Sequence, residues 1–575
     1  MLKRFLAYGR PYRKYAFWAV FCIVTETVFE LIIPLIMADM VDVGVANGDT
    51  AYIFRRGALM VGCALASMTL GVGASRFSAV LGHGLGAELR KTEYRKVQSF
   101  SFANTDHFQT SSLVTRLTND VTTVQNAVAT GLRPACRAPV MMTTALVVSF
   151  TLNAQLAVVF FVAAPILAVL LWQIIRHVQP MYGKMQGALD LVNRIVQENL
   201  TAIRVVKAYV RSNHEIDKFS QVNGNLRSVS ERAFRISTLN TPAQQLVMYG
   251  TILCLLWFGG GLINAGNMKV GELTGFLSYV LQVLNSLMML SGVFMMLTRA
   301  LASGGRILEV MEEEVDIRED RAKDIAVERG GIEFDHVFFK YKKDAEEYVL
   351  SDVSLSIKAG ETVAVIGQTG AAKTTLVQLI PRLYDATEGT VLVDGHPVWE
   401  YPLRHLRDAI AVVLQKNTLF SGTIRENLKW GREDATDGEL EEACRIACAD
   451  EFIGRLANGY DTELGQGGVN VSGGQKQRLC LARAILKKPK VLILDDSTSA
   501  VDTATEKKIR EGLAGALPGT TKIIIAQRIS SIMHADQIII LEDGRVEAVG
   551  DHDTLLRTSE IYRELYHSQQ EGGML

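Results

Sequence analysis

Six runs of mostly apolar residues dominate the first 300 residues of this 575-residue chain. A helix needs roughly 20 mostly apolar residues to cross the hydrocarbon core of a bilayer, and each run is long enough. We therefore predict six membrane-spanning helices. Their expected ranges are 15–38, 57–80, 131–152, 155–178, 244–265 and 273–298.

The charges in the connecting segments predict the orientation of these helices. Residues 37–54 contain three aspartates and no lysine or arginine, whereas the N-terminus and residues 81–130 and 179–243 are rich in both basic types. Because positive charge stays on the cytoplasmic side, we expect both termini and both long connections in the cytoplasm. The net charge of −1 gives no reason to expect nucleic acid as a partner.

The two long connections are too polar for lipid but contain few helix breakers. We expect spans two to five to continue through them as helices, with reversals near residues 105–112 and 212–219 whose tips can dock on a cytoplasmic domain. An acidic linker over 311–330 follows the transmembrane domain at 1–310. The fold class is therefore multi-domain, with an all-α transmembrane domain of six long helices before an α/β domain over 331–575.

Charged residues inside the predicted spans need an explanation, because charge is costly in lipid. Glu26 and Glu30 lie four residues apart on the first span, and Arg133 and Arg137 repeat that spacing on the third. They form either ion pairs that lock the helices together or a polar wall of a substrate cavity. The sixth span carries two pairs of neighbouring methionines, which suit either an adaptable apolar cavity or ordinary core packing. These are Met288, Met289, Met295 and Met296.

A phosphate-binding loop is the clearest motif of the second half. Residues 363–366 form a short apolar run, typical of a buried strand, and a G-x-x-x-x-A-K-T sequence follows it. Backbone N–H groups of such a loop, with the N-terminus of the next helix, bind phosphates. We expect Lys373 to reach the β- and γ-phosphates of ATP and the Thr374 hydroxyl to bind Mg²⁺. The loop comprises Gly367, Gln368, Thr369, Gly370, Ala371, Ala372, Lys373, Thr374 and Thr375.

One position of this loop departs from the usual pattern. Ala372 stands where the pattern has glycine. Its methyl group crowds the loop but removes no hydrogen-bond donor, so we expect ATP binding to survive. A second apolar strand, 491–494, ends in Asp495, which is placed to hold Mg²⁺ through water. The second half is thus expected to be an α/β P-loop NTPase domain.

Further motifs occur in the order found in ATP-binding-cassette (ABC) proteins. Residues 471–475 resemble the family's signature motif, and six spans before one cassette resemble a type IV ABC exporter half-transporter, whose coupling helices would be the two reversals. The resemblance implies an ATPase-coupled transporter in the cytoplasmic (inner) membrane of a bacterium. The resemblance assigns adenine stacking to Tyr341, and it assigns to Gln415 the role of the glutamine that contacts the metal ion. It places Asp502 in the D-loop. The signature residues, which would act on ATP bound by the partner, are Ser472, Gly473, Gly474 and Gln475.

Two catalytic positions depart from the family pattern. The family places a glutamate directly after the magnesium aspartate, and this chain has Asp496, which is one methylene shorter. A positioning error of about 1 Å can cost on the order of 100-fold in rate. The family also has a histidine that contacts the γ-phosphate, and this chain has Gln527, which cannot carry a positive charge. We expect a degenerate site that binds ATP better than it hydrolyses it.

The signature motif of this chain is nearly intact, although its own catalytic positions depart from the family pattern. This combination predicts what kind of partner the chain has. Two cassettes of the family meet head to tail, so each ATP lies between one phosphate loop and the other chain's signature. We expect a heterodimer of the multidrug-exporter type, in which a second half-transporter supplies the competent catalytic residues. A slow homodimer is the alternative. The expected substrate is an amphipathic drug, lipid or peptide. An importer resembling siderophore uptake systems and a nucleotide-gated regulator or channel remain alternative functions.

Overall fold

The computed structural model describes residues 7–342, 344–497 and 501–571. The chain divides into two compact units. The membrane unit comprises Met1–Gln98 and Thr110–Glu313, and the cassette unit comprises Ser99–Gln109 and Glu314–Leu575. The predicted domain boundary near residue 310 is close to this division. The short segment 99–109, however, was predicted within the transmembrane domain and packs with the cassette unit instead.

Six helices in the described part of the membrane unit are long and apolar enough to cross a membrane, which confirms the six predicted spans. Several are built from consecutive helical segments. In chain order they are η1 (Arg10–Tyr12), α2 (Arg13–Asp39), η2 (Met40–Val45), α3 (Thr50–Gln98), α5 (Thr110–Thr115), η3 (Arg116–Asp120), α6 (Val121–Ala129), α7 (Leu132–Leu152), α8 (Ala154–Thr201), α10 (Ser212–Ser237), α11 (Asn240–Asn264) and α12 (Val270–Glu312).

Most of these helices are much longer than a membrane is thick. The 49 residues of α3 and the 48 of α8 extend for about 70 Å at 1.5 Å per residue, against about 30 Å of hydrocarbon. The prediction that spans two to five continue as helices is therefore confirmed, and span six continues as well, to Glu312. The polar ends of these helices form stalks that project beyond the apolar segments.

Two short helices mark the reversals between the stalks. The first reversal contains α4 (Phe102–His107), which overlaps the predicted range of 105–112. The second contains α9 (Ile203–Ala208), so the predicted range of 212–219 was wrong, because residues from Ser212 onward are already inside α10. The helix breaks at Val210, which adopts a left-handed conformation with φ of +54°. No glycine or proline in the sequence signals this break.

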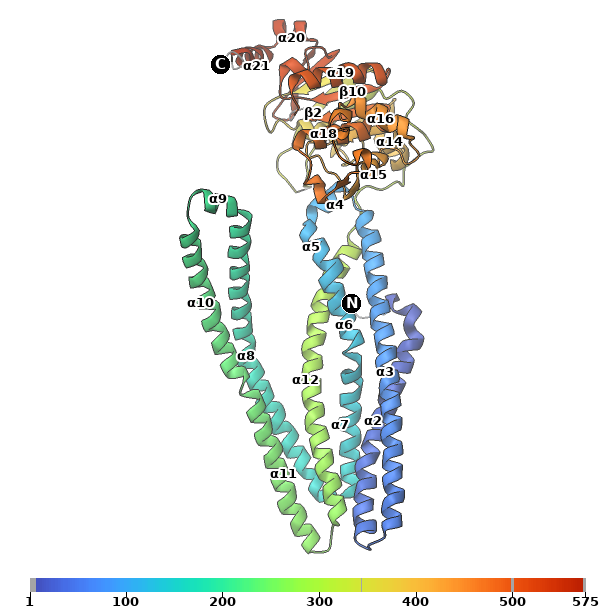
Figure 1. Cartoon of the computed structure of the whole chain (residues 1–575), viewed down its shortest axis with the longest axis vertical. Coiled ribbons are helices and arrows are strands. Elements are labelled where there is room, and N and C mark those ends of the chain that lie inside the picture. The colour runs from blue at the N-terminus through green and yellow to red at the C-terminus, as the bar shows by residue number, and fades with distance from the viewer. Residues whose placement is uncertain (1–6, 343, 498–500, 572–575) are drawn as a thin grey trace. The chain divides into compact units, whose positions relative to one another are not determined.

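The α8–α10 pair forms an arm that separates from the other stalks. Figure 1 shows α8 and α10 lying side by side and diverging from α12 toward the tip at α9. Side-chain contacts hold the two helices of the arm together, as Asn199 donates to Glu215 (3.2 Å) and Lys218 pairs with Glu198 (3.4 Å). The arm is therefore a two-helix hairpin with a large exposed surface.

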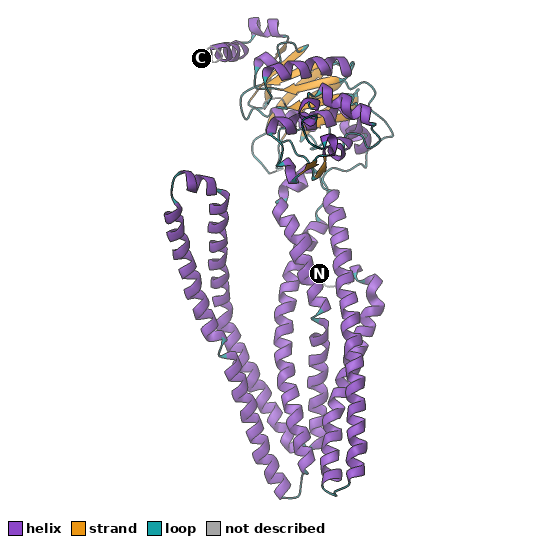
Figure 2. Cartoon of the chain, viewed as in Figure 1, coloured by secondary structure: helices purple, strands orange, loops and turns teal. Residues whose placement is uncertain are grey.

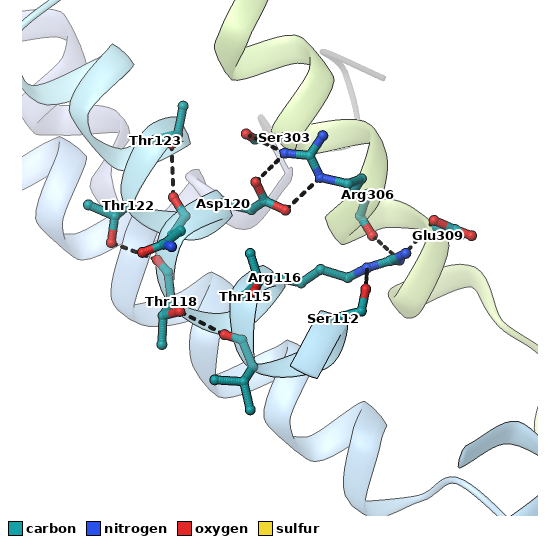
Figure 3. Close-up of polar contacts among 12 residues, drawn as sticks. Ser112, Thr115, Arg116, Thr118, Asp120, Thr122, Thr123, Ser303, Arg306 and Glu309 are labelled. Carbon is teal, nitrogen blue, oxygen red and sulfur yellow. Dashed lines mark hydrogen bonds and ion pairs between the residues drawn. The ribbon is translucent and has the colours of Figure 1, made fainter. Parts of the chain in front are cut away.

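A charged cluster ties the stalk of η3 to the stalk of α12, as Figure 3 shows. Two nitrogens of the Arg306 guanidinium donate to the two carboxylate oxygens of the nearly buried Asp120, and the bond from Nε to Oδ2 is 2.8 Å long. In return, Arg116 donates to the backbone carbonyl of Arg306 (2.8 Å) and pairs with Glu309 (2.8 Å). Bidentate arginine–carboxylate pairs fix geometry as well as adding energy. The two stalks are thus held in one register.

The cassette unit contains the strands, which Figure 2 colours orange. Its described strands are β1 (Ile332–Phe339), β2 (Leu350–Ile357), β3 (Thr362–Ile366), β4 (Glu388–Val393), β5 (His396–Pro397), β6 (Ile410–Val413), β7 (Gly422–Thr423), β8 (Glu463–Leu464), β9 (Val491–Asp495), β10 (Thr521–Ile525), β11 (Gln537–Glu542) and β12 (Arg545–Gly550). The helices are α13 (Lys373–Leu379), η4 (Val398–Glu400), α14 (Leu403–Ala409), α15 (Ile424–Lys429), α16 (Asp437–Ile446), α17 (Asp450–Ile453), η5 (Gly459–Asp461), η6 (Gln466–Gly468), α18 (Gly473–Leu486), α19 (Thr503–Ala516), η7 (Ile529–Ser531), α20 (His552–Thr558) and α21 (Glu560–Glu571).

A six-stranded sheet forms the centre of this unit. Its strand order is β12-β11-β3-β10-β9-β6, in which β11 to β6 run parallel and β12 is antiparallel. The parallel strands are buried almost continuously, as expected for a sheet covered on both faces. An antiparallel sheet of order β2-β1-β4-β5 packs against the same core. The carboxyl ends of β3, β10, β9 and β6 therefore meet along one edge, where such sheets bind ligands.

The stalk cluster generates a stability prediction. Arg306→Met leaves the Asp120 carboxylate buried without its bidentate partner, and we expect a loss on the order of 2 kcal/mol and a lower thermal unfolding temperature. Arg306→Met combined with Asp120→Leu removes both charges and should recover most of that loss. The exposed pair of Arg227 and Glu231 on α10 supplies the control, because Arg227→Met should change the unfolding temperature little. Equal effects of Arg306→Met and Arg227→Met would contradict the prediction.

Candidate nucleotide site

The phosphate loop connects β3 to α13. Lys373, the first residue of α13, turns back so that its Nζ donates to the carbonyls of Gly367 (2.8 Å) and Gln368 (2.7 Å). Burial lowers the pKa of Lys373, while the charges of Asp495 and Asp496 act in the opposite direction. The loop therefore holds a cation between its carbonyls and the acidic end of β9, as a site for phosphates and a metal ion requires.

Ala372 occupies a conformation that favours glycine. Its backbone is left-handed, with φ of +67° and ψ of 23°, and it caps the N-terminus of α13. An L-residue with a Cβ pays about 1–2 kcal/mol for this conformation. The sequence predicted that the Ala372 methyl group crowds the loop, whereas the structure shows that the backbone of Ala372 is strained. Gly370, two residues earlier, has φ of +92° and meets no atom within 4 Å of an added Cβ.

The residues predicted to bind the metal ion lie at the carboxyl edge of the sheet. The Thr374 hydroxyl donates to Asp495 Oδ1 (3.1 Å), and Asp495 is almost fully buried at the end of β9. Burial raises the pKa of Asp495, which the hydrogen bond from Thr374 partly opposes. Gln415 follows β6 and is exposed at the same edge. Hydroxyl, carboxylate and amide oxygens are hard ligands, so this donor set fits Mg²⁺.

The two positions that depart from the family pattern touch each other. Gln527 follows β10, which lies between β3 and β9, and its Nε2 donates to Asp496 Oδ2 (3.0 Å). Asp496 itself is left-handed, with φ of +48°, and its backbone carbonyl accepts a bond from Gln477 (3.4 Å). One carboxylate oxygen of the water-activating position is therefore occupied by an amide that can neither accept nor transfer a proton.

Aromatic side chains form the adenine side of the site. The Tyr341 hydroxyl hydrogen-bonds the Thr375 hydroxyl (2.9 Å), and its ring stands edge-on to Phe339 (4.9 Å between centroids) and Tyr384 (5.2 Å). About two fifths of Tyr341 remains exposed, so the ring can stack on a base. Its position beside the phosphate loop agrees with the role that the family resemblance assigns.

The first reversal of the chain packs against this aromatic cluster. The Tyr384 hydroxyl donates to Asp106 Oδ2 (2.6 Å) on α4, and its ring packs edge-on against Phe102 (5.9 Å). Asn104 of the same helix donates to the backbone carbonyl of Glu314 (2.8 Å). One tyrosine thus links α4 to the ring of Tyr341. Neither Tyr384 nor Asp106 belongs to a motif, and the sequence analysis missed both.

The signature residues are arranged around the start of α18. Ser472 caps this helix by accepting a bond from the Gln475 backbone (3.3 Å), and the Ser472 backbone donates to Gln475 Oε1 (2.8 Å). Gly473 and Gly474 begin the helix, so its N-terminus is available to an anion. Asp502 caps α19 through Thr505 (2.9 Å), whereas Ser499 of the predicted D-loop lies outside the described residues.

The charged residues of the membrane unit form ion pairs. Glu26, which is 2% exposed, pairs with Arg133 and with Arg137 (3.5 Å), and Arg137 also pairs with Glu30. Glu26, Glu30 and Arg133 share a cleft of about 570 Å³ between α2, α3 and α7. The structure therefore contains the predicted ion pairs between the first and third spans. A role of these residues in a substrate cavity stays a prediction. The methionines of the sixth span do not line this cleft. They are Met288, Met289, Met295 and Met296.

The strained alanine generates a prediction. Ala372→Gly removes the penalty of a left-handed residue that carries a Cβ and should raise the thermal unfolding temperature, by about 1 kcal/mol of stability at most. Gly370→Ala places a methyl group in open space at a left-handed position and should lower stability by a similar amount. Both are measured on the purified transporter without nucleotide. A lower unfolding temperature for Ala372→Gly would show that the methyl contact with the core outweighs the strain.

Comparisons with known proteins agree with this geometry. The chain matches the family model of the ABC transporter transmembrane region over residues 16–287 and that of the ABC transporter over residues 350–499. It is 40% identical to the uncharacterized ABC transporter ATP-binding protein YfiB of Bacillus subtilis (strain 168), over 99% of this chain and 98% of that protein. It is 31% identical to the putative multidrug export ATP-binding/permease protein YgaD of the same organism, over 99% of both.

The fold also has a counterpart of known structure. A bacterial Atm1-family ABC exporter with ATP bound superimposes with a TM-score of 0.83 at 24% identity, covering 97% of this chain and 99% of that one. The predicted fold class is confirmed over nearly the whole chain. The chain therefore belongs to the ABC transporter family, as a multi-pass membrane half-transporter that joins six helices to one ATP-hydrolysing cassette.

Proposed function

We propose that this chain is the degenerate-site subunit of a heterodimeric, ATP-driven exporter. The observation that supports the proposal is the hydrogen bond between Gln527 and Asp496 at the end of β9. It joins the two departures from the family pattern into one pair. The phosphate loop, the metal residues and Tyr341 keep the geometry that ATP binding needs.

The pair weakens hydrolysis for two physical reasons. The Asp496 side chain is one methylene shorter than glutamate, so its carboxylate stands back from an attacking water by about a bond length. The amide of Gln527 donates to that carboxylate and occupies one of its two oxygens, and it adds no positive charge near the γ-phosphate. ATP is then held by this site and cleaved slowly.

The intact signature indicates where fast hydrolysis occurs. Ser472 and Gln475 form a complete capping box, which fixes the N-terminus of α18, and Ser472 and Gly473 are exposed there. We infer that this N-terminus completes the site of a second half-transporter whose own glutamate and histidine are in place. Mg²⁺ and ATP are the cofactors at both sites.

The arm of the membrane unit carries a surface that fits such a partner. Five large apolar side chains at its tip are between 57% and 86% exposed. Exposed apolar surface of this kind is typical of a protein interface. We propose that the partner's cassette covers it. The five residues are Leu200, Val205, Tyr209, Val210 and Ile216.

The proposed substrates are amphipathic small molecules. Besides the charged cleft, the membrane unit has an apolar hollow of about 680 Å³ between α8 and α11. One recess is lined by apolar residues and the other contains charged residues, and an amphipathic molecule has parts that suit each kind of lining. We propose that the protein lies in a bacterial cytoplasmic membrane with both termini in the cytoplasm, and that transport runs outward. The relative named as a putative multidrug exporter supports this substrate class.

The asymmetry generates a prediction for the co-purified complex. Asp496→Asn removes a carboxylate that contributes little to turnover, so the ATPase rate should fall less than twofold. Substituting glutamine for the partner's catalytic glutamate should reduce it by about 100-fold or more. Asp496→Glu combined with Gln527→His should restore a second active site and raise turnover. Equal losses from the two single substitutions, or purification of this chain as a fully active homodimer, would contradict the proposal.

A further inference from the structure

The C-terminal helix α21 is anchored beneath the segment that carries Gln527. Tyr562 of this helix is fully buried, and it belongs to the same core cluster as Ile529 and Ile532. Its hydroxyl hydrogen-bonds His552 Nδ1 (2.7 Å) on the preceding helix, α20. A fully buried tyrosine with a satisfied hydroxyl fixes both the position and the rotation of the helix.

The rotation set by Tyr562 determines where a glutamine two turns later points. Tyr566 and Gln569 follow at four and seven residues, so all three lie on one face of α21. Tyr566 packs against the same cluster. The Gln569 side chain then extends past the core to the backbone that follows β10.

Gln569 makes two backbone hydrogen bonds there, one with each end of its amide. Its Nε2 donates to the carbonyl of Gln527 (2.8 Å), and its Oε1 accepts from the N–H of Ile529 (2.8 Å). The intervening Arg528 is extended, with φ of −106° and ψ of 127°. The amide therefore pairs with this extended segment as a neighbouring β-strand residue would, although none of the described strands lies beside it.

We call the two backbone hydrogen bonds of Gln569 the clamp. The clamp acts on the carboxyl edge of the sheet through Gln527. The backbone of Gln527 is held by Gln569, and the side chain of Gln527 donates to Asp496. The two hydrogen bonds of Gln569 reduce the freedom of the segment from which Gln527 reaches the nucleotide site. A displaced segment would withdraw that amide.

We propose that Gln569 is a positioning residue for the nucleotide site, and that α21 controls through it how firmly the Gln527 segment closes on bound ATP. The role requires a donor and an acceptor on one side chain. Glutamate at position 569 lacks the donor and would face the Gln527 carbonyl with a negative charge, and asparagine is one methylene too short. The inference concerns this chain's own site and holds whichever chain is the partner.

The test uses the assembled transporter in nanodiscs and measures two quantities. Gln569→Ala removes the acceptor of the Ile529 N–H, so it should speed the amide hydrogen exchange of Ile529 by about 10-fold and leave the exchange of β10 unchanged. The dissociation of Mg-ATP from this site, followed with a fluorescent ATP analogue, should accelerate severalfold in Gln569→Ala and in Gln569→Glu. Gln569→Glu keeps an oxygen that can accept from Ile529, so its effect on this exchange should be smaller than that of Gln569→Ala.

Ser568→Glu is the matched control, since it adds the same charge to an exposed neighbour on a different face of α21. It should change neither measurement. Unchanged exchange at Ile529 in both Gln569 variants would overturn the clamp. Faster exchange with unchanged ATP dissociation would overturn control of the site by α21. A failure of the heterodimer proposal would instead show in the ATPase comparison of Asp496→Asn with the partner's variant, which these measurements do not use.

Discussion

The parallel pairing of β3, β10, β9 and β6 determines where this protein can do chemistry. Each strand ends at the same edge, so the residues that follow them meet there although they are distant in sequence. The phosphate loop follows β3, the magnesium acid ends β9, and Gln527 follows β10. Because β10 lies between the other two, Gln527 follows a strand that neighbours both β3 and β9, and it hydrogen-bonds Asp496. We propose that replacements at that position act on hydrolysis first.

The same edge holds the residues proposed for ATP binding and those proposed for ATP cleavage. Binding by a phosphate loop depends on backbone N–H groups and on Lys373, which side-chain replacement elsewhere does not remove. Cleavage depends on placing a carboxylate and a γ-phosphate contact to within about 1 Å. Asp496 and Gln527 hydrogen-bond each other, at 3.0 Å. In the proposed degenerate site, this pair stands where the family has a glutamate and a histidine.

Two sets of contacts link this edge to other parts of the cassette unit. Tyr341 and Tyr384 connect the phosphate loop to Asp106 of α4, and Gln569 connects the Gln527 segment to α21. In the membrane unit, the Arg306–Asp120 cluster holds two stalks in register. Charged and aromatic contacts of fixed geometry are suited to transmitting rigid-body motion, because they resist sliding more than apolar packing does.

The sequence by itself determined the features that depend on local composition and spacing. Six apolar runs predicted six spans, because the length of a span is fixed by the bilayer, and consecutive motif residues predicted the phosphate loop and Asp495. It also identified Asp496 and Gln527 as departures, yet could not show that they bond. Only the tertiary structure brought Gln569 to Gln527, 42 residues apart, and Tyr384 to Asp106, 278 residues apart. The second reversal moved for the same reason: the left-handed Val210 has no local signal, and such contacts arise from packing alone.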